Sequence, residues 1–141
     1  MIEDIVLDDL LDACRDCQTV IFKPGEAVFR QGDDADAMYV VLSGSVRILS
    51  GSTVYETVRT GGLLGEMAII DPDAPRSATA ICGTRAELLE IDGEKFLRMV
   101  AQSPAFALTV MRTMTRRLRV MNRRYKGDSP AVAALQRAIP P

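Results

Sequence analysis

The chain has 141 residues, of which 48% are hydrophobic and 26% are charged, and its formal net charge is −2. This length suits one domain with its own core, and the hydrophobic fraction excludes an intrinsically disordered chain. No hydrophobic run reaches the roughly 20 residues of a membrane-spanning helix, and the N-terminus lacks the basic and hydrophobic regions of a signal peptide, so we expect a soluble, cytoplasmic protein.

The sequence contains no histidine and three cysteines. The lack of histidine excludes Ser-His-Asp triads, Cys-His pairs and histidine-rich metal sites. Cys14, Cys17 and Cys82 are too few for a disulfide scaffold, so reduced thiols are expected. Because nothing in the chain pairs a nucleophile with a base, we expect neither an enzyme nor a resident cofactor or metal.

Charge is distributed unevenly along the chain. Residues 1–94 hold 7 basic and 18 acidic side chains, whereas residues 95–126 hold 9 basic and none that is acidic. Such asymmetry indicates either a nucleic-acid or membrane partner, or two parts of one molecule that attract each other.

The N-terminal half begins with an amphipathic pattern and continues with short strands. Residues 2–16 carry hydrophobic side chains at helical spacing, which predicts a short helix. The chain then alternates between runs rich in Val, Ile, Phe and Tyr and turns rich in Gly and Asp, which predicts about seven strands in an antiparallel sandwich or barrel. The predicted strands are 19–23, 27–30, 38–42, 45–49, 54–59, 78–82 and 87–91.

The C-terminal part is predicted to be helical. The sequence Asp92-Gly93-Glu94 opens a helix that extends to about Gln102. Ser103 and Pro104 then form an N-cap with proline at the first helical position, which predicts a long helix to about Tyr125. Residues 127–141 are expected to be a flexible tail, so the predicted domain is 1–126, with sheets at about 18–92 and helices at about 93–125.

One segment, residues 61–80, carries groups suited to a phosphorylated sugar. Gly65 permits close backbone approach, and the first N–H groups of a following helical turn are free to meet an anion. Arg76 and Ser77 add a cationic fork and a hydroxyl for a phosphate. Glu66 supplies a carboxylate that can accept a hydrogen bond from a sugar hydroxyl.

Two motifs in this segment, Gly65-Glu66-Met67-Ala68 and Pro75-Arg76-Ser77-Ala78-Thr79, resemble the phosphate-binding cassette of cyclic nucleotide-binding domains. Such domains occur in catabolite activator proteins, regulatory subunits of cAMP-dependent kinase and cyclic nucleotide-gated channels. The resemblance covers roughly residues 5–125 and is supported by glycines at 25, 32, 44 and 62. It implies an α+β, mainly β fold: an eight-stranded antiparallel, jelly-roll-like β-roll with an N-terminal helix and C-terminal helices.

The resemblance also implies a role for each site residue. Arg76 would pair with the cyclic phosphate, and Ser77 would donate to the same group. Glu66 would accept the ribose 2′-hydroxyl, and Gly65 would let the ribose approach. The backbone N–H groups of Met67 and Ala68 would face the ligand. As side chains, Leu63, Leu64, Met67 and Ile69 are expected in the core.

Base recognition is assigned to the long helix by the same resemblance. Met121 and Asn122 occupy positions from which that helix meets the base, and Asn122 could bond the purine edge or simply face solvent. We favour cAMP over cGMP as the ligand.

The long helix also carries a heptad pattern, with gaps of 4, 3, 4, 3 and 4 between hydrophobic positions from Ala107 to Tyr125. This pattern predicts a parallel homodimer through Met111, Met114, Leu118 and Met121, or else packing of the same stripe on the chain's own sheets. The arginines around the seam are interpreted as solvated flanks that complement the acidic body; they are Arg112, Arg116, Arg117, Arg119, Arg123 and Arg124.

The expected function is therefore a stand-alone receptor module, or a fragment of a longer protein, that changes conformation through its C-terminal helix and acts on a downstream protein not identifiable from sequence. Catabolite activators carry a helix-turn-helix after this helix, for which residues 127–141 are too short. Two alternatives remain: a redox or iron–sulfur sensor using Cys14 and Cys17, and a nucleic-acid-binding regulator using the basic helix.

Overall fold

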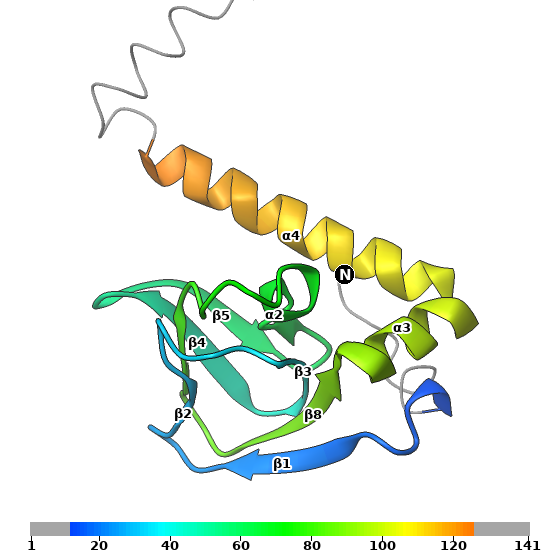
Figure 1. Cartoon of the computed structure of the whole chain (residues 1–141). Coiled ribbons are helices and arrows are strands. Elements are labelled where there is room, and N and C mark those ends of the chain that lie inside the picture. Colours follow the sequence, from blue (N-terminus) through cyan, green and yellow to red (C-terminus); the bar gives the residue numbers. More distant parts are fainter. Residues whose placement is uncertain (1–11, 126–141) are drawn as a thin grey trace, which may run out of the picture.

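The structure is a computed structural model that describes residues 12–125. Eight strands form two four-stranded antiparallel sheets, and three helices follow or interrupt them (Figure 1). The strands are β1 (Gln18–Phe22), β2 (Ala27–Phe29), β3 (Ala37–Ser43), β4 (Ser45–Ser50), β5 (Thr53–Arg59), β6 (Leu63–Leu64), β7 (Thr79–Cys82) and β8 (Ala86–Asp92). The helices are α2 (Met67–Ile70), α3 (Gly93–Gln102) and α4 (Pro104–Tyr125).

The sheets have the strand orders β1-β8-β3-β6 and β2-β7-β4-β5. They enclose one hydrophobic core between them, and α3 and α4 cover the outer face of the first sheet (Figure 1). This arrangement confirms the predicted antiparallel β-roll with C-terminal helices.

Strand β3 is buried on both faces, which explains its continuous hydrophobic sequence. Successive side chains of a strand point to opposite faces of the sheet. Tyr39 and Val41 therefore lie in the core between the sheets, whereas Met38 and Val40 lie in a second core under the helices. We call these the roll core and the helix core. Because β3 contributes to both, the helices rest on the same strand that supports the roll.

The helix boundaries follow local capping as predicted. The Asp92 carboxylate accepts a hydrogen bond of 2.9 Å from the Lys95 N–H and so caps α3. Pro104 occupies the first position of α4, where its missing N–H has no cost. Phe96 of α3 and Phe106 of α4 pack with their ring centroids 5.6 Å apart, which fixes the two helices to each other in the helix core.

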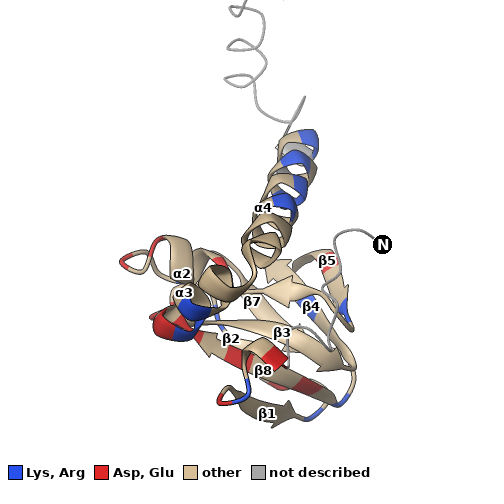
Figure 2. Cartoon of the chain, turned by 90° about the vertical axis from the view of Figure 1, so that its right-hand side faces the viewer, with Lys and Arg blue, Asp and Glu red and all other residues tan. Residues whose placement is uncertain are grey.

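Opposite charges attract within the molecule, as one of the two sequence interpretations expected. Basic residues are concentrated along α4, whereas acidic residues lie mainly on the strands, in loops and at the start of α3 (Figure 2). Arg98 of α3 donates two hydrogen bonds, of 2.7 and 2.9 Å, to the Asp16 carboxylate before β1. Both side chains are largely exposed, so this pair contributes little to stability.

Some predictions fall outside the described residues, and one strand was not predicted from the residue pattern. Of the predicted N-terminal helix 2–16, only Asp12 and Ala13 are described as helical, and the tail 127–141 is not described. Strand β6 has only two residues, too few for an alternating pattern to reveal. No helix among residues 12–125 is long and hydrophobic enough to cross a membrane.

The expectation of three reduced thiols is wrong for one pair, because the structure joins Cys14 and Cys17 in a disulfide. Cys14 is buried in the helix core, and Cys17 lies three positions further along the chain, so the bond closes a short turn ahead of β1. Cys82 is a free, buried thiol, and burial raises its pKa.

We expect Leu89→Ala to destabilise the protein by about 2–5 kcal/mol, because it leaves a cavity in the helix core beneath α3 and α4. The measurement is the free energy of unfolding by chemical denaturation. Ile21→Ala, which truncates a 57% exposed side chain on β1, is the control and should change stability by no more than about 0.5 kcal/mol. Equal losses in both variants would contradict the assignment of a core beneath the helices.

Candidate functional site

The candidate site is built on a glycine turn between β6 and α2. Gly65 has a φ of +74°, a conformation that L-residues with side chains rarely adopt. A Cβ atom there would lie 2.7 Å from Nη1 of Arg76 and 3.2 Å from the Phe29 ring. Glycine is therefore required both by the backbone conformation and by the close approach of Arg76.

Arg76 is held at this turn by its backbone as well as its side chain. Its N–H donates to the Asp33 carbonyl at 2.8 Å, and its carbonyl accepts from the Gly32 N–H at 2.9 Å. The guanidinium donates from Nη2 to the Ala37 carbonyl at 2.8 Å and from Nη1 to the Gly65 carbonyl at 3.3 Å. The loop before β3 thus fixes the position of the Arg76 backbone, and the carbonyls of Ala37 and Gly65 fix the position of its guanidinium.

The Arg76 guanidinium is a buried cation without a carboxylate partner among the described residues. It is 6% exposed, and its Nε has no hydrogen-bond partner within residues 12–125. Its central carbon lies 4.1 Å from the centroid of the Phe29 ring, a cation–π contact. Burial lowers the pKa of this side chain below its ordinary value, although it remains charged at neutral pH. A buried cation with an unused donor is suited to binding an anion.

Glu66 is also buried, and it is bound by an arginine of α4. The Glu66 side chain does not cap α2. Instead, both carboxylate oxygens accept from Nη1 of Arg117, at 2.6 and 2.8 Å. Arg117 also donates from Nε to Glu56 of β5 at 2.8 Å and from Nη2 to the Leu63 carbonyl. One guanidinium therefore connects α4 to two carboxylates and one carbonyl of the roll.

The pKa of Arg117 reflects this environment. Burial alone would lower the pKa of the guanidinium, but the charges of Glu66 and Glu56 and their hydrogen bonds raise it above its ordinary value. The group therefore keeps its charge, and the cluster stays an ion pair rather than becoming neutral.

The structure brings some of the predicted site residues together and leaves others apart. Gly65, Glu66 and Arg76 meet at the turn, whereas Ser77 is exposed beside Arg76. The Ala68 N–H already donates to the Gly65 carbonyl at 3.1 Å.

The Met67 side chain is 49% exposed, so its expected place in the core is wrong. It follows the buried Glu66 on the outer side of a single helical turn. Leu63 and Leu64 are buried as expected, and Ile69 is partly buried.

The far end of α4 does not reach these groups. Asn122 is exposed and makes no hydrogen bond with the turn in the described part of the chain. The Met121 side chain lies outside the described residues.

Sequence analysis missed Arg117 and Glu56 as site residues. Arg117 was interpreted as a solvated flank, but its side chain is only 15% exposed. A signal was present: Phe106, Val110, Thr113 and Arg117 recur with gaps of 4, 3 and 4, and the first three are buried. An arginine that continues a buried row needs a buried acceptor.

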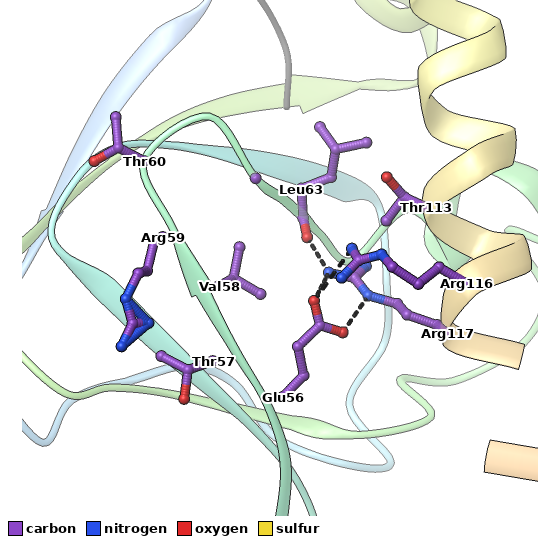
Figure 3. Close-up of a pocket in the computed structure, with 10 residues that line it drawn as sticks. Glu56, Thr57, Val58, Arg59, Thr60, Leu63, Thr113, Arg116 and Arg117 are labelled. Atoms are coloured by element: carbon purple, nitrogen blue, oxygen red, sulfur yellow. Dashed lines mark hydrogen bonds and ion pairs between the residues drawn. The ribbon is translucent and has the colours of Figure 1, made fainter. Parts of the chain in front are cut away.

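A cavity of about 210 Å³ lies between β5, the turn that follows it and α4 (Figure 3). Glu56, Arg116 and Arg117 line one side of it, as do Leu63 and Thr113. Arg76 and Ser77 do not line this cavity, so it lies beside Arg117 and Glu56 rather than beside Arg76.

Comparison with known proteins places the chain in a family. The family model described as "Cyclic nucleotide-binding domain" matches residues 19–103. The chain is 34% identical, over 107 residues, to the cyclic AMP receptor protein of Thermus thermophilus, a match that covers 72% of this chain and 49% of that protein. It is 31% identical to the cAMP-dependent protein kinase regulatory subunit of Schizosaccharomyces pombe, covering 79% of this chain and 26% of that protein.

The fold agrees with these sequence matches. The crystal structure of Thermus thermophilus catabolite activator protein superposes with a TM-score of 0.73 at 28% identity, covering 86% of this chain and 59% of that one. The chain thus spans about half the length of the Thermus thermophilus receptor. It belongs to the cyclic nucleotide-binding domain family, as the two motifs around Gly65 and Arg76 predicted.

We expect Gly65→Ala to be more destabilising than Gly51→Ala, although both glycines have positive φ, of +74° and +61°. No atom lies within 4 Å of a Cβ at Gly51, so that variant has only the backbone strain of about 1–2 kcal/mol. Gly65→Ala adds the contact with Arg76, which should cost a further ~1–3 kcal/mol. Free energies of unfolding measure the difference, and equal values would show that Arg76 does not press on this turn.

Proposed function

We propose that this protein is a non-catalytic receptor module for a 3′,5′-cyclic nucleotide, with cAMP preferred to cGMP. The observation that carries the proposal is the buried guanidinium of Arg76, which has an unpartnered Nε and lies against a glycine whose Cβ would collide with it. A singly charged cyclic phosphate is an anion of suitable size and charge to accept from it.

The neighbouring groups fit the remainder of such a ligand. Ser77 is exposed next to Arg76, so its hydroxyl is accessible to a phosphate oxygen. The buried carboxylate of Glu66 has acceptor positions beyond those used by Arg117, since a carboxylate offers about four. A ribose 2′-hydroxyl could donate to one of them, which would distinguish ribose from 2′-deoxyribose.

The preference for cAMP is supported by the names of the relatives, which are a cyclic AMP receptor protein and a cAMP-dependent kinase regulatory subunit. Under this proposal the base is met by α4, with Asn122 as the candidate for the purine edge. Because Asn122 makes no hydrogen bond with the turn among the described residues, its proposed role requires that α4 move toward the site on binding.

The proposed output is a change in the position of α4. Arg117 joins α4 to Glu66, a residue of the proposed ribose site, so a ligand that alters the surroundings of Glu66 also alters the hold on α4. A ligand shifts such an equilibrium only by its difference in affinity for the two states.

The exposed stripe of α4 supports a proposed homodimer. Leu108, Met111 and Leu118 are exposed, the last two by 55% and 59%, and they lie on one side of the helix, whereas Phe106 and Val110 face the helix core. Met114 packs partly against the helix core and so serves the protomer as well. The two sequence interpretations thus each describe part of the helix. Covering the exposed stripe with a second copy would remove hydrophobic surface from water.

Nucleotide binding is tested by isothermal titration calorimetry and by the melting temperature, which should rise with the logarithm of free cAMP. We expect Arg76→Ala to weaken binding by about 2–5 kcal/mol, because it leaves the phosphate without its cation. Arg76→Lys, which keeps the charge but loses the planar fork, should bind with intermediate affinity. The control is Arg85→Ala, whose side chain is 60% exposed. Unchanged affinity in folded Arg76 variants would refute the assignment.

The proposed dimer is tested by Leu118→Glu, which places a charge in the exposed stripe. Sedimentation equilibrium should give a dimer for the unaltered protein and a monomer for the variant. Leu97→Glu on α3 is the matched control, because Leu97 is 69% exposed but lies outside the stripe. A dimer that survives Leu118→Glu rules out this interface.

A further inference from the structure

Glu56 lies outside both sequence motifs, yet it shares one arginine with the proposed ribose acceptor. Its carboxylate accepts from Nε of Arg117 at 2.8 Å and from Nη2 at 3.3 Å. Nη1 of the same guanidinium bonds both oxygens of Glu66 (Figure 3 shows the Glu56 side of this bridge). Arg116 adds a second cation 3.4 Å from Glu56. Glu56 is thus the second anchor of α4 on the roll.

An arginine side chain has only five N–H donors, so the carboxylates of Glu56 and Glu66 compete for those of Arg117. In the structure, Nε and Nη2 are directed to Glu56 and the Leu63 carbonyl, and Nη1 alone serves Glu66. Without the charge of Glu56, Glu66 would be the only anion near Arg117. The guanidinium would then turn more of its donors toward Glu66 and occupy the acceptor positions that a ribose hydroxyl needs.

The surroundings leave room for such a rearrangement. The cavity of about 210 Å³ adjoins Glu56 and Arg117, so neither side chain is enclosed by packed atoms on every side. The Glu56 and Arg117 side chains are 16% and 15% exposed, which keeps them out of bulk water and makes their ion pair stronger than a surface pair.

We propose that Glu56 is a positioning residue that holds Arg117 away from full engagement with Glu66, and so sets both the preference for ribose over 2′-deoxyribose and the attachment of α4. This inference rests on the proposed function, because it assigns Glu66 to the sugar. Glu56 itself need not touch the nucleotide.

The test compares the dissociation constants of cAMP and 2′-deoxy-cAMP by calorimetry in three proteins: the unaltered chain, Glu56→Gln and Glu87→Gln. Glu87 is the matched control, a carboxylate in the exposed ion pair with Arg85 at 3.4 Å. In Glu56→Gln the ratio of the 2′-deoxy to the ribose constant should fall at least about threefold, because the hydroxyl loses part of a hydrogen bond to a charged acceptor. In Glu87→Gln the ratio should not change.

If the role of Glu56 is purely structural, Glu56→Gln should weaken the binding of both nucleotides by the same factor. The ratio of their dissociation constants would then be unchanged, and that result would overturn the proposal. Glu56→Asp retains the charge with a shorter reach and should give an intermediate ratio; it replaces Glu56→Gln if that variant does not fold.

The amide hydrogen exchange of α4 in the nucleotide-free protein is a second readout, and Glu56→Gln should accelerate it in residues 110–118 relative to α3. If the unaltered chain binds neither nucleotide, the proposed function fails. The amide hydrogen exchange of α4 then tests by itself whether Glu56 attaches this helix. If Glu56→Gln does not accelerate the exchange, that role is overturned as well.

Discussion

Two guanidinium groups are largely withdrawn from water in this fold, and the way each is compensated determines the form of the site. Burying a charge without partners is strongly unfavourable. Arg117 is compensated fully, by two carboxylates and a carbonyl. Among residues 12–125, Arg76 is compensated by two carbonyls and by the rings of Phe29 and Tyr39, and its Nε has no hydrogen-bond partner. The roll can bear this incomplete compensation because the rest of its core is well packed. The result is a buried positive charge with one donor, Nε, that has no hydrogen-bond partner among the described residues.

The route from this site to the surface of the molecule runs through β3 and α4. Strand β3 supplies the Ala37 carbonyl to Arg76 and, through Met38 and Val40, the floor on which the helices lie. Helix α4 returns to the site through Arg117. A close-packed interior does not deform gradually, but it can change from one packing arrangement to another. The helix thus has two supports, the hydrophobic helix core and the ion pairs of Arg117 with Glu56 and Glu66.

The sequence predicted the parts of this arrangement that depend on local chemistry. The glycine turn, the arginine after proline, the capped helices and the alternating strands each depend on neighbours in the chain. Glu56 and Arg117, in contrast, are 61 residues apart in sequence, and their partnership exists only once α4 crosses β5. Charge asymmetry was compatible either with attraction between the basic helix and the acidic body or with a nucleic-acid or membrane partner, and it did not indicate which arginine turns inward. The two-residue strand β6 was not predicted for another reason: it forms because it pairs with β3, and its own sequence is too short to show a strand pattern.

Under the proposed function, the bridge between Arg117 and its two carboxylates involves energies of the size that coupling between two sites requires. Coupling between sites in proteins is typically ~1–3 kcal/mol, and a hydrogen bond to a charged group contributes about 1.5–3 kcal/mol. Moving one donor of Arg117 from Glu66 to Glu56 would therefore be enough to couple the proposed ribose site to α4 without breaking the helix core. Since Glu56 and Glu66 are both on the roll, such an exchange changes how α4 is held while leaving the charge of the cluster constant. Under the proposed function, such an exchange keeps Arg117 and its two carboxylates paired both with and without the nucleotide.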